Sequence, residues 1–246
     1  MLSILVTGLT GRMGQAVKAA VEQNPDTRVG GTHDIGQELS DSLPSCDAII
    51  DFSHHTFTTC MLEKAVAFGK NVVIGTTAHT PAERAAIVEA SKKIPVVFAS
   101  NFSVGVNTLF WLTRKAAGIL QDGFDMEIVE MHHHNKIDAP SGTARSLAEI
   151  LCDVTGMDYE KDVSHGRLGN IGARPEREIG MHSLRGGDVV GDHTVIFAGD
   201  GERLELTHKA SSRMTFAQGA VRAALWLRDK PAGLYDMEDV LGLKNM

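Results

Sequence analysis

The N-terminal stretch MLSILVTGLTGRMG is the feature that most constrains the fold, because a short apolar run leads into glycines at positions 8, 11 and 14. A buried strand, a tight turn and a helix start in this order are typical of the first unit of a parallel sheet that binds a dinucleotide. Glycines let the turn tighten and the backbone approach a pyrophosphate, and the helix N-terminus offers free N–H groups to the phosphates. The sequence therefore predicts a phosphate-binding loop here.

An acidic residue follows at the expected distance. Asp34 ends the second predicted strand and is placed to accept hydrogen bonds from the ribose hydroxyls of the cofactor. Ile35 comes next where an arginine would bind a 2′-phosphate, which favours NADH, although Arg12 within the loop leaves NADPH open. An ordinary βα turn is the alternative. Short-chain dehydrogenases share the GxxGxxG spacing, but neither Tyr159 nor Tyr235 has a lysine four residues later, which excludes that family.

Apolar runs and helix-like segments alternate over the first hundred residues. The expected strands are Ser3–Thr7, Arg28–His33, Ala48–Phe52, Asn71–Ile74 and Val96–Ala99. The expected helices between them are Met13–Gln23, Phe57–Phe68 and Pro81–Lys92, the last with Thr80 as N-cap and Glu83 completing a capping box. This alternation predicts an α/β domain with a Rossmann-like parallel sheet.

The pattern changes after Asn101. Val106–Leu120 and Ser141–Val154 are expected to be helical and Met126–His132 extended, and three further strands follow without intervening helices, at Glu178–Ser183, Asp192–Ala198 and Arg203–His208. We expect a mostly antiparallel sheet, with turns at Gly186-Gly187 and Asp200-Gly201. Phe216–Leu227 is an Ala-rich helix with a stripe at Phe216, Ala220, Ala223, Ala224 and Leu227. We predict a dinucleotide-binding domain of residues 1–103 plus 213–246, and an inserted α+β domain of residues 104–212 for substrate binding and oligomerisation.

Composition excludes several classes of protein. The formal charge of −7 argues against nucleic acid as a partner, and no apolar run is long enough to cross a membrane. The apolar N-terminal run lacks a basic segment before it, so we expect no signal peptide. Cys46, Cys60 and Cys152 are odd in number and widely spaced, which predicts three buried thiols in a reducing cytoplasm.

Two more loops follow predicted strands of the parallel sheet, at Gly75 to Thr77 and at Ala99 to Phe102. Ligands of an open parallel sheet bind beyond the carboxyl ends of its strands. Both loops are therefore expected to face the nicotinamide half of the cofactor, with an ordinary turn as the alternative for each.

The segment EMHHHNKIDAPSGT, from Glu130 to Thr143, carries the chemistry. Glu130, His132, His134 and Lys136 would share one face of a continued strand, so a metal site is the first hypothesis. Lys136 would bring a cation to the same face, which disfavours a divalent ion, and we predict no metal. Solvated histidines on an edge strand are a second alternative.

Acid–base chemistry is the better interpretation. Histidine has an ordinary pKa nearest to neutrality, and lysine supplies a proton donor and a fixed positive charge. Ser141 is a plausible N-cap, and the N–H groups of Gly142 and Thr143 then form a seat for a carboxylate. Imidazoles, an ammonium group and a helix N-terminus within a dozen residues predict a site for a small dianion.

The histidine segment resembles the signature of the dihydrodipicolinate reductase family, also called 4-hydroxy-tetrahydrodipicolinate reductases, of lysine and diaminopimelate synthesis. The stretches GLTGRMG, IDFS, VIGTT, ASNFSVGVN and GERLELTHKASSRMTFAQGAVRAALWL also match, so the resemblance covers nearly the whole chain. It implies an NAD(P)H-dependent oxidoreductase that reduces a cyclic dicarboxylate with loss of water. It also implies a homotetramer assembled through the sheet of the second domain, and C-terminal helices that rejoin the first domain.

The resemblance also implies residue roles. His132 matches the catalytic acid/base and Lys136 a second proton donor. Substrate contacts match His133, Gly142 and Thr143, with Ser141 beside them. Contacts to NADH or NADPH match Gly8, Leu9, Thr10, Gly11, Arg12, Met13, Asp34, Gly75, Thr76, Thr77, Ala99, Ser100, Asn101 and Phe102. Arg213 and Phe216 match residues that approach the cofactor from the C-terminal segment.

The sequence departs from the family in three places. Only 11 residues separate Asp34 from Cys46, where many members carry an additional strand and helix, so we expect a shortened cofactor sheet. His134 and Asn135 stand where other members often have Arg and His, and Ile35 replaces a residue that is often basic.

Two rival functions remain at this point. One is another dinucleotide-dependent enzyme of similar build, such as an aspartate or homoserine dehydrogenase, which the Ser-Gly-Thr helix start beside paired His and Lys disfavours. The other is a protein that senses NAD(P) without catalysis, against which His132 and Lys136 argue.

Overall fold

The computed structural model describes all 246 residues, and the chain divides into two compact units. Unit 1 comprises Met1–Val104 and Arg213–Met246, and unit 2 comprises Gly105–Ser212.

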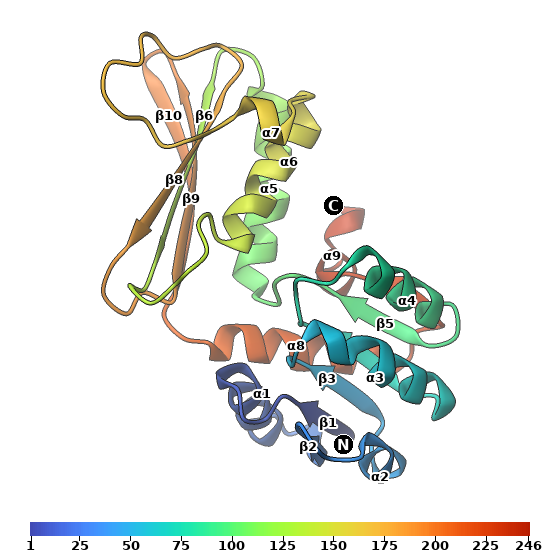
Figure 1. Cartoon of the computed structure of the whole chain (residues 1–246). Coiled ribbons are helices and arrows are strands. Elements are labelled where there is room, and N and C mark those ends of the chain that lie inside the picture. Colours follow the sequence, from blue (N-terminus) through green and yellow to red (C-terminus); the bar gives the residue numbers. More distant parts are fainter. The chain divides into compact units, whose positions relative to one another are not determined.

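Unit 1 is built on a six-stranded sheet in the order β11-β5-β4-β3-β1-β2, in which every pair of neighbours is parallel (Figure 1). Its strands are β1 (Leu2–Thr7), β2 (Thr27–His33), β3 (Ala48–Asp51), β4 (Asn71–Ile74), β5 (Pro95–Phe98) and β11 (Gly233–Tyr235). The prediction of a Rossmann-like parallel sheet is confirmed.

Helices cover both faces of this sheet. They are α1 (Arg12–Gln23), α2 (Leu39–Ser42), α3 (His55–Ala67), α4 (Pro81–Ser91), α8 (Met214–Leu227) and α9 (Met237–Leu241), with short 3-10 turns η1 (Leu43–Ser45) and η2 (Leu243–Asn245). One apolar core joins α1 and α8 to one face, and a second joins α3 and α4 to the other. Side chains alternate along a strand, so Ile4 and Val6 enter the first core and Leu5 the second.

The capping box at the start of α4 is present as predicted, since Thr80 accepts from the Glu83 backbone and Glu83 accepts from that of Thr80. In α8, four of the five predicted stripe positions are buried, but Phe216 lies outside the core. The segment between Asp34 and Cys46 contains only α2 and η1. Strand β11 was not predicted, because three residues are too few to show a period.

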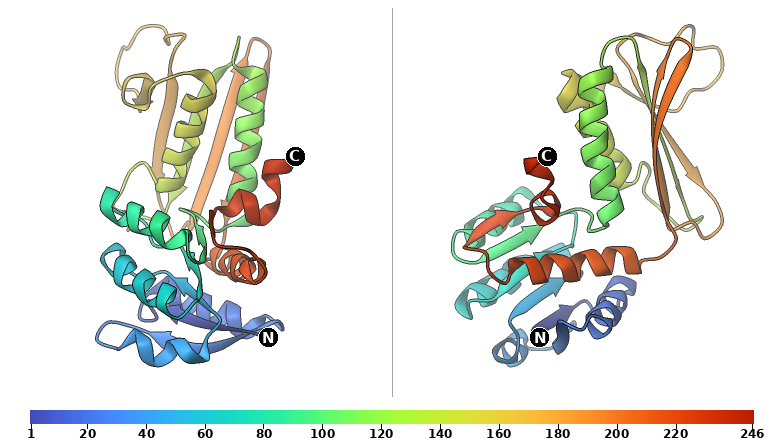
Figure 2. Two further views of the ribbon diagram at one scale, coloured as in Figure 1. Left: turned by 90° about the vertical axis from the view of Figure 1, so that its right-hand side faces the viewer. Right: turned by 180° about the vertical axis from the view of Figure 1, so that it is seen from behind.

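Unit 2 has a five-stranded sheet in the order β10-β9-β6-β8-β7. Its strands are β6 (Asp125–His132), β7 (Val163–His165), β8 (Ile179–Arg185), β9 (Gly191–Gly199) and β10 (Glu202–Ala210). Its helices are α5 (Val104–Leu120), α6 (Gly142–Thr155) and α7 (Tyr159–Asp162). As Figure 2 shows, α5 and α6 lie on the same face of this sheet, where they share one apolar core with it, and no helix of unit 2 covers the other face.

The prediction of a mostly antiparallel sheet is confirmed for one half of the sheet, where β9 pairs antiparallel with β10 and β6, and is wrong for the half that contains β8 and β7. Strand β6 pairs antiparallel with β9 but parallel with β8, and β7 also pairs parallel with β8. β6 lies between the sequence neighbours β8 and β9, and the chain re-enters the sheet after α6 and α7 at the edge strand β7. Strands β8 and β9 are therefore neighbours in the sequence but not in the sheet.

The expectation of three buried thiols is also wrong in one case. Cys46 and Cys152 are buried and Cys60 is exposed, and none forms a disulfide. In the described structure no helix combines the length and the apolar character needed to cross a bilayer.

Candidate functional site

A crevice of about 420 Å³ opens in unit 1 beyond the carboxyl ends of β1, β2 and β3. β1 lies between the other two strands, so the chain leaves it to one side and returns on the other. Ligands of open parallel sheets bind at such a switch point. The crevice is lined by Gly8, Thr10, Gly11, His33, Asp34, Ile35, Phe52, Ser53, His54, Thr56 and Phe57.

The glycine loop has the geometry that a pyrophosphate requires. Gly8 has a φ of +68°, and a side chain there would strike the carbonyl group of Phe52. A side chain on Gly14 would strike the carbonyl oxygen of Gly8, so this glycine lets α1 begin close to the turn. Gly11 caps α1 without a side-chain hydrogen bond, and the first turn of the helix carries no acid. The cradle therefore fits the phosphates of a dinucleotide.

Asp34 closes the crevice at the end of β2. Its carboxylate accepts hydrogen bonds from the backbone N–H of Thr10 at 2.6 Å and of Ile35 at 2.9 Å. The backbone hydrogen bonds from Ile35 and Thr10 lower the pKa of Asp34, so the group is anionic at neutral pH. The Ile35 side chain is 99% exposed beside it, which leaves no cation at this point of the rim.

Aromatic residues of the crevice were not predicted. The rings of His33 and Phe57 are stacked, with centroids 4.8 Å apart and planes inclined by 12°. They stand at the end of β2 and in the first turn of α3, and together they contribute aromatic surface to the crevice. The available signal was that His33 ends a predicted strand and Phe57 begins the helix predicted after the next one, since the carboxyl ends of parallel strands share one edge of the sheet.

The other two predicted cofactor loops do not line this crevice. The Thr76 hydroxyl donates to Asp51 at 2.7 Å and accepts from the backbone N–H of Ser53 at 2.9 Å, which ties the ends of β3 and β4 together. Phe102 is 1% exposed and packs edge-on against Phe52 in the core. Their proposed contact with the nicotinamide half stays a prediction.

In unit 2, β6 ends at His132, so the predicted histidine face is shorter than expected. Glu130 and His132 do share the face that packs against α6, whereas His134 and Lys136 lie in the turn that follows. The Glu130 side chain is fully buried and that of His132 is 11% exposed. The strand period therefore brings together only the first two of the four residues.

Glu130 accepts hydrogen bonds from both sides. Oε2 lies 2.6 Å from Nδ1 of His132, Arg185 contacts both oxygens at 2.9 Å, and the backbone N–H of Ser141 lies 3.2 Å from Oε1. Burial raises the pKa of Glu130, but hydrogen bonds from His132, Arg185 and Ser183 outweigh it and lower that pKa to about 2. Glu130 and His132 thus bind each other, and no group of three or more His, Cys, Asp or Glu side chains is arranged to hold a metal ion.

Lys136 lies in a turn held by its own neighbours. Its backbone N–H donates to the carbonyl oxygen of His133 at 3.1 Å, and its ammonium group lies 2.8 Å from Oδ1 of Asp138. Arg185 donates to the backbone carbonyl of Asp138 at 2.7 Å. One guanidinium group therefore contacts both Glu130 on the strand and the turn that carries Lys136.

Ser141 is the N-cap of α6, as predicted, and its hydroxyl accepts from the backbone N–H of Ala144 at 3.1 Å. Gly142 and Thr143 form the first turn of the helix. The Ser141 hydroxyl also lies 3.0 Å from Nε2 of His193, a residue of β9 that sequence reasoning missed. Its only signal was the alternating pattern of β9, which marks a buried position and not a role.

His193 adds a neutral ring to the cluster. Its imidazole packs edge-on against that of His132 with centroids 5.2 Å apart, and its Nδ1 is buried without a hydrogen-bond partner. Burial, followed by the nearby His132, lowers the pKa of His193 to about 3, and Lys136 also contributes. The charges of both predicted catalytic residues thus lower the pKa of the His193 ring.

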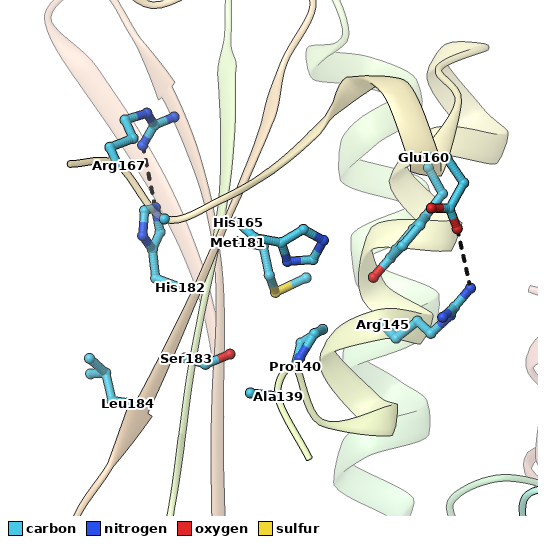
Figure 3. A pocket seen from close by; sticks show the side chains of 12 residues that line it. Ala139, Pro140, Arg145, Glu160, His165, Arg167, Met181, His182, Ser183 and Leu184 are labelled. Carbon is cyan, nitrogen blue, oxygen red and sulfur yellow. Dashed lines mark hydrogen bonds and ion pairs between the residues drawn. The ribbon is translucent and has the colours of Figure 1, made fainter. Parts of the chain in front are cut away.

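A separate groove of about 680 Å³ lies in unit 2 between β8 and α6 (Figure 3). It is lined by Ala139, Pro140, Arg145, Tyr159, Glu160, His165, Gly166, Arg167, Met181, His182, Ser183 and Leu184. Its cations are already paired, Arg145 with Glu149 and Arg167 with Glu127 and Glu178. None of the predicted site residues lines it, so the larger cavity is not where the predicted chemistry lies.

Comparisons with known proteins agree with this arrangement. Residues 2–102 match the family model of the dihydrodipicolinate reductase N-terminus, and residues 105–241 match that of the C-terminus. A 4-hydroxy-tetrahydrodipicolinate reductase of Akkermansia muciniphila is 68% identical over 100% of both chains. One of Syntrophotalea carbinolica is 45% identical over 99% of this chain and 100% of the relative.

Solved structures show the same fold. A dipicolinate-bound dihydrodipicolinate reductase from Paenisporosarcina sp. TG-14 has a TM-score of 0.77 and 24% identity, and the match covers 96% of this chain and 97% of that one. With both halves matched by family models and close relatives matched end to end, the chain belongs to the dihydrodipicolinate reductase family.

Proposed function

We propose that this chain catalyses the NAD(P)H-dependent reduction of 4-hydroxy-tetrahydrodipicolinate to tetrahydrodipicolinate, with loss of water, in lysine and diaminopimelate synthesis. The observation that carries the proposal is the buried His132, bonded to Glu130 next to the start of α6, in a chain 68% identical to a reductase of that name. The cofactor would bind in the crevice of unit 1, where the glycine cradle fits its phosphates.

The residues of unit 2 provide the rest of the chemistry. The reduced nicotinamide, when bound, supplies the hydride to a conjugated cyclic imine that forms when the 4-hydroxyl group leaves. The negative charge that develops on the substrate is quenched by a proton from His132, assisted by Lys136. The substrate carboxylates are held by His133, Lys136 and the N–H groups at the start of α6, where the helix dipole favours an anion.

We also propose a homotetramer assembled through the helix-free face of the unit 2 sheet. Leu184 on this face is 49% exposed, which leaves apolar surface for a second copy. An ion-pair cluster of Glu127, Arg167, Arg174 and Glu178 lies on the same face of the sheet. Glu127 of β6 projects from this face, as Leu184 of β8 does. Since the thiols form no disulfide, we place the enzyme in the reducing cytoplasm.

A coupled assay tests the reaction. The upstream synthase generates the unstable substrate in place, and the consumption of NADH or NADPH is followed by absorbance. We expect consumption that requires the synthase, its substrates and this chain together. If the chain binds the dinucleotide yet consumes neither form, the proposal is wrong and the protein is a sensor of NAD(P). Reduction of NAD+ or NADP+ with aspartate or homoserine as the hydride donor would assign the chain to the rival dehydrogenases.

A further inference from the structure

We infer that Glu130, held by Arg185, is a positioning residue of the reductase: it orients His132, keeps the proton on its Nδ1 and couples the ring to the start of α6. The inference rests on the proposed function for its catalytic consequence. Its structural part concerns the free protein and can be tested without substrate.

The two oxygens of the Glu130 carboxylate accept hydrogen bonds from different partners. Oε2 faces His132 and one nitrogen of Arg185, and Oε1 faces the other nitrogen of Arg185 and the backbone N–H of Ser141. A fully buried carboxylate with partners on both oxygens has one orientation open to it. The imidazole ring and the first residue before α6 are therefore fixed relative to one another through a single side chain.

The charge of Glu130 determines which ring nitrogen exchanges protons. An ionised carboxylate only accepts hydrogen bonds, so Nδ1 of His132 must carry the hydrogen. Nε2 is then the nitrogen available to give a proton and to take one back. Gly191 lies next to this atom. A Cβ at position 191 would come within 3.0 Å of Nε2. A glycine at this position leaves the reactive nitrogen uncovered.

Arg185 explains why Glu130 keeps its charge throughout a turnover. After His132 gives up its proton, the neutral ring no longer balances a buried carboxylate. The bidentate guanidinium group supplies a permanent positive charge, because arginine stays protonated in proteins. The same group holds the backbone of Asp138, whose carboxylate pairs with Lys136. Glu130 and Arg185 thus connect the strand, the lysine turn and the helix start.

A double-mutant cycle separates positioning from general stability. Glu130→Gln should lower kcat by about 10²-fold in the coupled assay, the usual contribution of a positioned acid. In a His132→Gln background the same substitution should lower kcat by less than about threefold, because it acts through the missing ring. If the two losses simply multiply, Glu130 does not act through His132 and the inference is wrong.

Glu83→Gln is the matched control, since Glu83 also bonds a histidine ring, His55, at 2.9 Å, and glutamine preserves the capping box. Its kcat should stay within about twofold of the parent value. Should Glu130→Gln not fold, Arg185→Lys replaces it in the cycle, because lysine keeps the positive charge but lacks the two-pronged geometry. Its loss in kcat should likewise vanish when His132 is absent.

The ring nitrogens can be observed directly in the free protein. In ¹⁵N-histidine-labelled protein at alkaline pH, with His132 assigned by its loss in His132→Gln, the neutral ring should carry its hydrogen on Nδ1. Glu130→Gln should shift it toward the Nε2-protonated form, and an unchanged ring would overturn the inference. If the parent chain is inactive in the coupled assay but Glu130→Gln still moves the hydrogen to Nε2, the proposed function is refuted and the positioning role stands.

Discussion

The backbone N–H of Thr10 donates to Oδ2 of Asp34 at 2.6 Å, so the glycine loop after β1 and the end of β2 are joined at the rim of the crevice. The bond serves two purposes. It holds the loop against the sheet, and it keeps an anionic carboxylate where the adenosine ribose would lie. A 2′-phosphate would meet this charge with no cation at position 35 to offset it.

We therefore predict a preference for NADH. The kcat/KM for NADH should exceed that for NADPH by about tenfold, because the anionic Asp34 repels the 2′-phosphate. Ile35→Arg should narrow or reverse the ratio, since an exposed guanidinium at this point pairs with a phosphate. Steady-state kinetics with both cofactors provide the measurement. Equal efficiency with the parent chain would mean that Arg12 supplies the missing cation.

Removal of the predicted proton donors should affect kcat and KM differently. His132→Gln should lower kcat at least ~10²-fold because the proton source is lost. Lys136→Met should lower kcat and also raise KM for the dicarboxylate, since it removes the positive charge expected to hold the substrate. The affinity for NADH, measured by fluorescence titration, should not change in either. A His132→Gln enzyme with normal kcat would contradict the proposed mechanism.

Ser141→Ala should cost more than the loss of an ordinary N-cap. Loss of a helix cap costs about 1 kcal/mol, and the buried His193 ring would also lose its partner at about 1–3 kcal/mol. Thr80→Ala is the control, because the Thr80 hydroxyl caps α4 and bonds Glu83, whereas that of Ser141 bonds a histidine ring directly. Urea unfolding of the two variants gives the difference. The KM for substrate should rise in Ser141→Ala alone.

The stability of the protein should decline below neutral pH because of His193. Burial lowers its pKa from 6.5 to about 3, so between these values the unfolded chain binds a proton that the folded chain does not. The contribution of the neutral His193 ring to the free energy of unfolding is complete above pH 6.5. It falls as the pH drops toward 3, by at most about 1.4 kcal/mol per pH unit.

Urea unfolding at several pH values between 5 and 7 measures this slope. His193→Gln should reduce this slope but not abolish it, since burial also lowers the pKa values of His79 and His208. Glu130 and Glu127, whose pKa values are lowered to about 2 in spite of burial, add their own loss only as the pH falls below about 4.5. An equal slope in the parent and in His193→Gln would show that another histidine is responsible.

Two helical glycines should respond in opposite directions to alanine. A side chain on Gly219 in α8 would strike the carbonyl oxygen of Phe102, so Gly219→Ala should destabilise the fold by about 1–3 kcal/mol. Gly118 in α5 is exposed, and its nearest neighbour would be Val154 at 4.0 Å, so Gly118→Ala should stabilise by about 0.5–1 kcal/mol. Thermal unfolding of both variants compares them directly.

The sequence by itself determined the features that depend on local pattern. The glycine spacing after β1, the alternation of strands and helices in the first hundred residues, the capping box at Thr80 and the cap at Ser141 each arise within a few residues of chain. Such features follow from backbone conformation and side-chain period, which neighbouring residues control. The family signature in the histidine segment is likewise contiguous.

Only the tertiary structure decided which distant residues contact these local features. Arg185 reaches Glu130 from 55 residues away, His193 reaches Ser141 from 52 residues away, and β6 lies between β8 and β9. A period of two reports that one face of a strand is buried but not which strand lies beside it. The partner of a buried charge depends on that pairing, so the carboxylate behind His132 became visible only when the sheet was assembled.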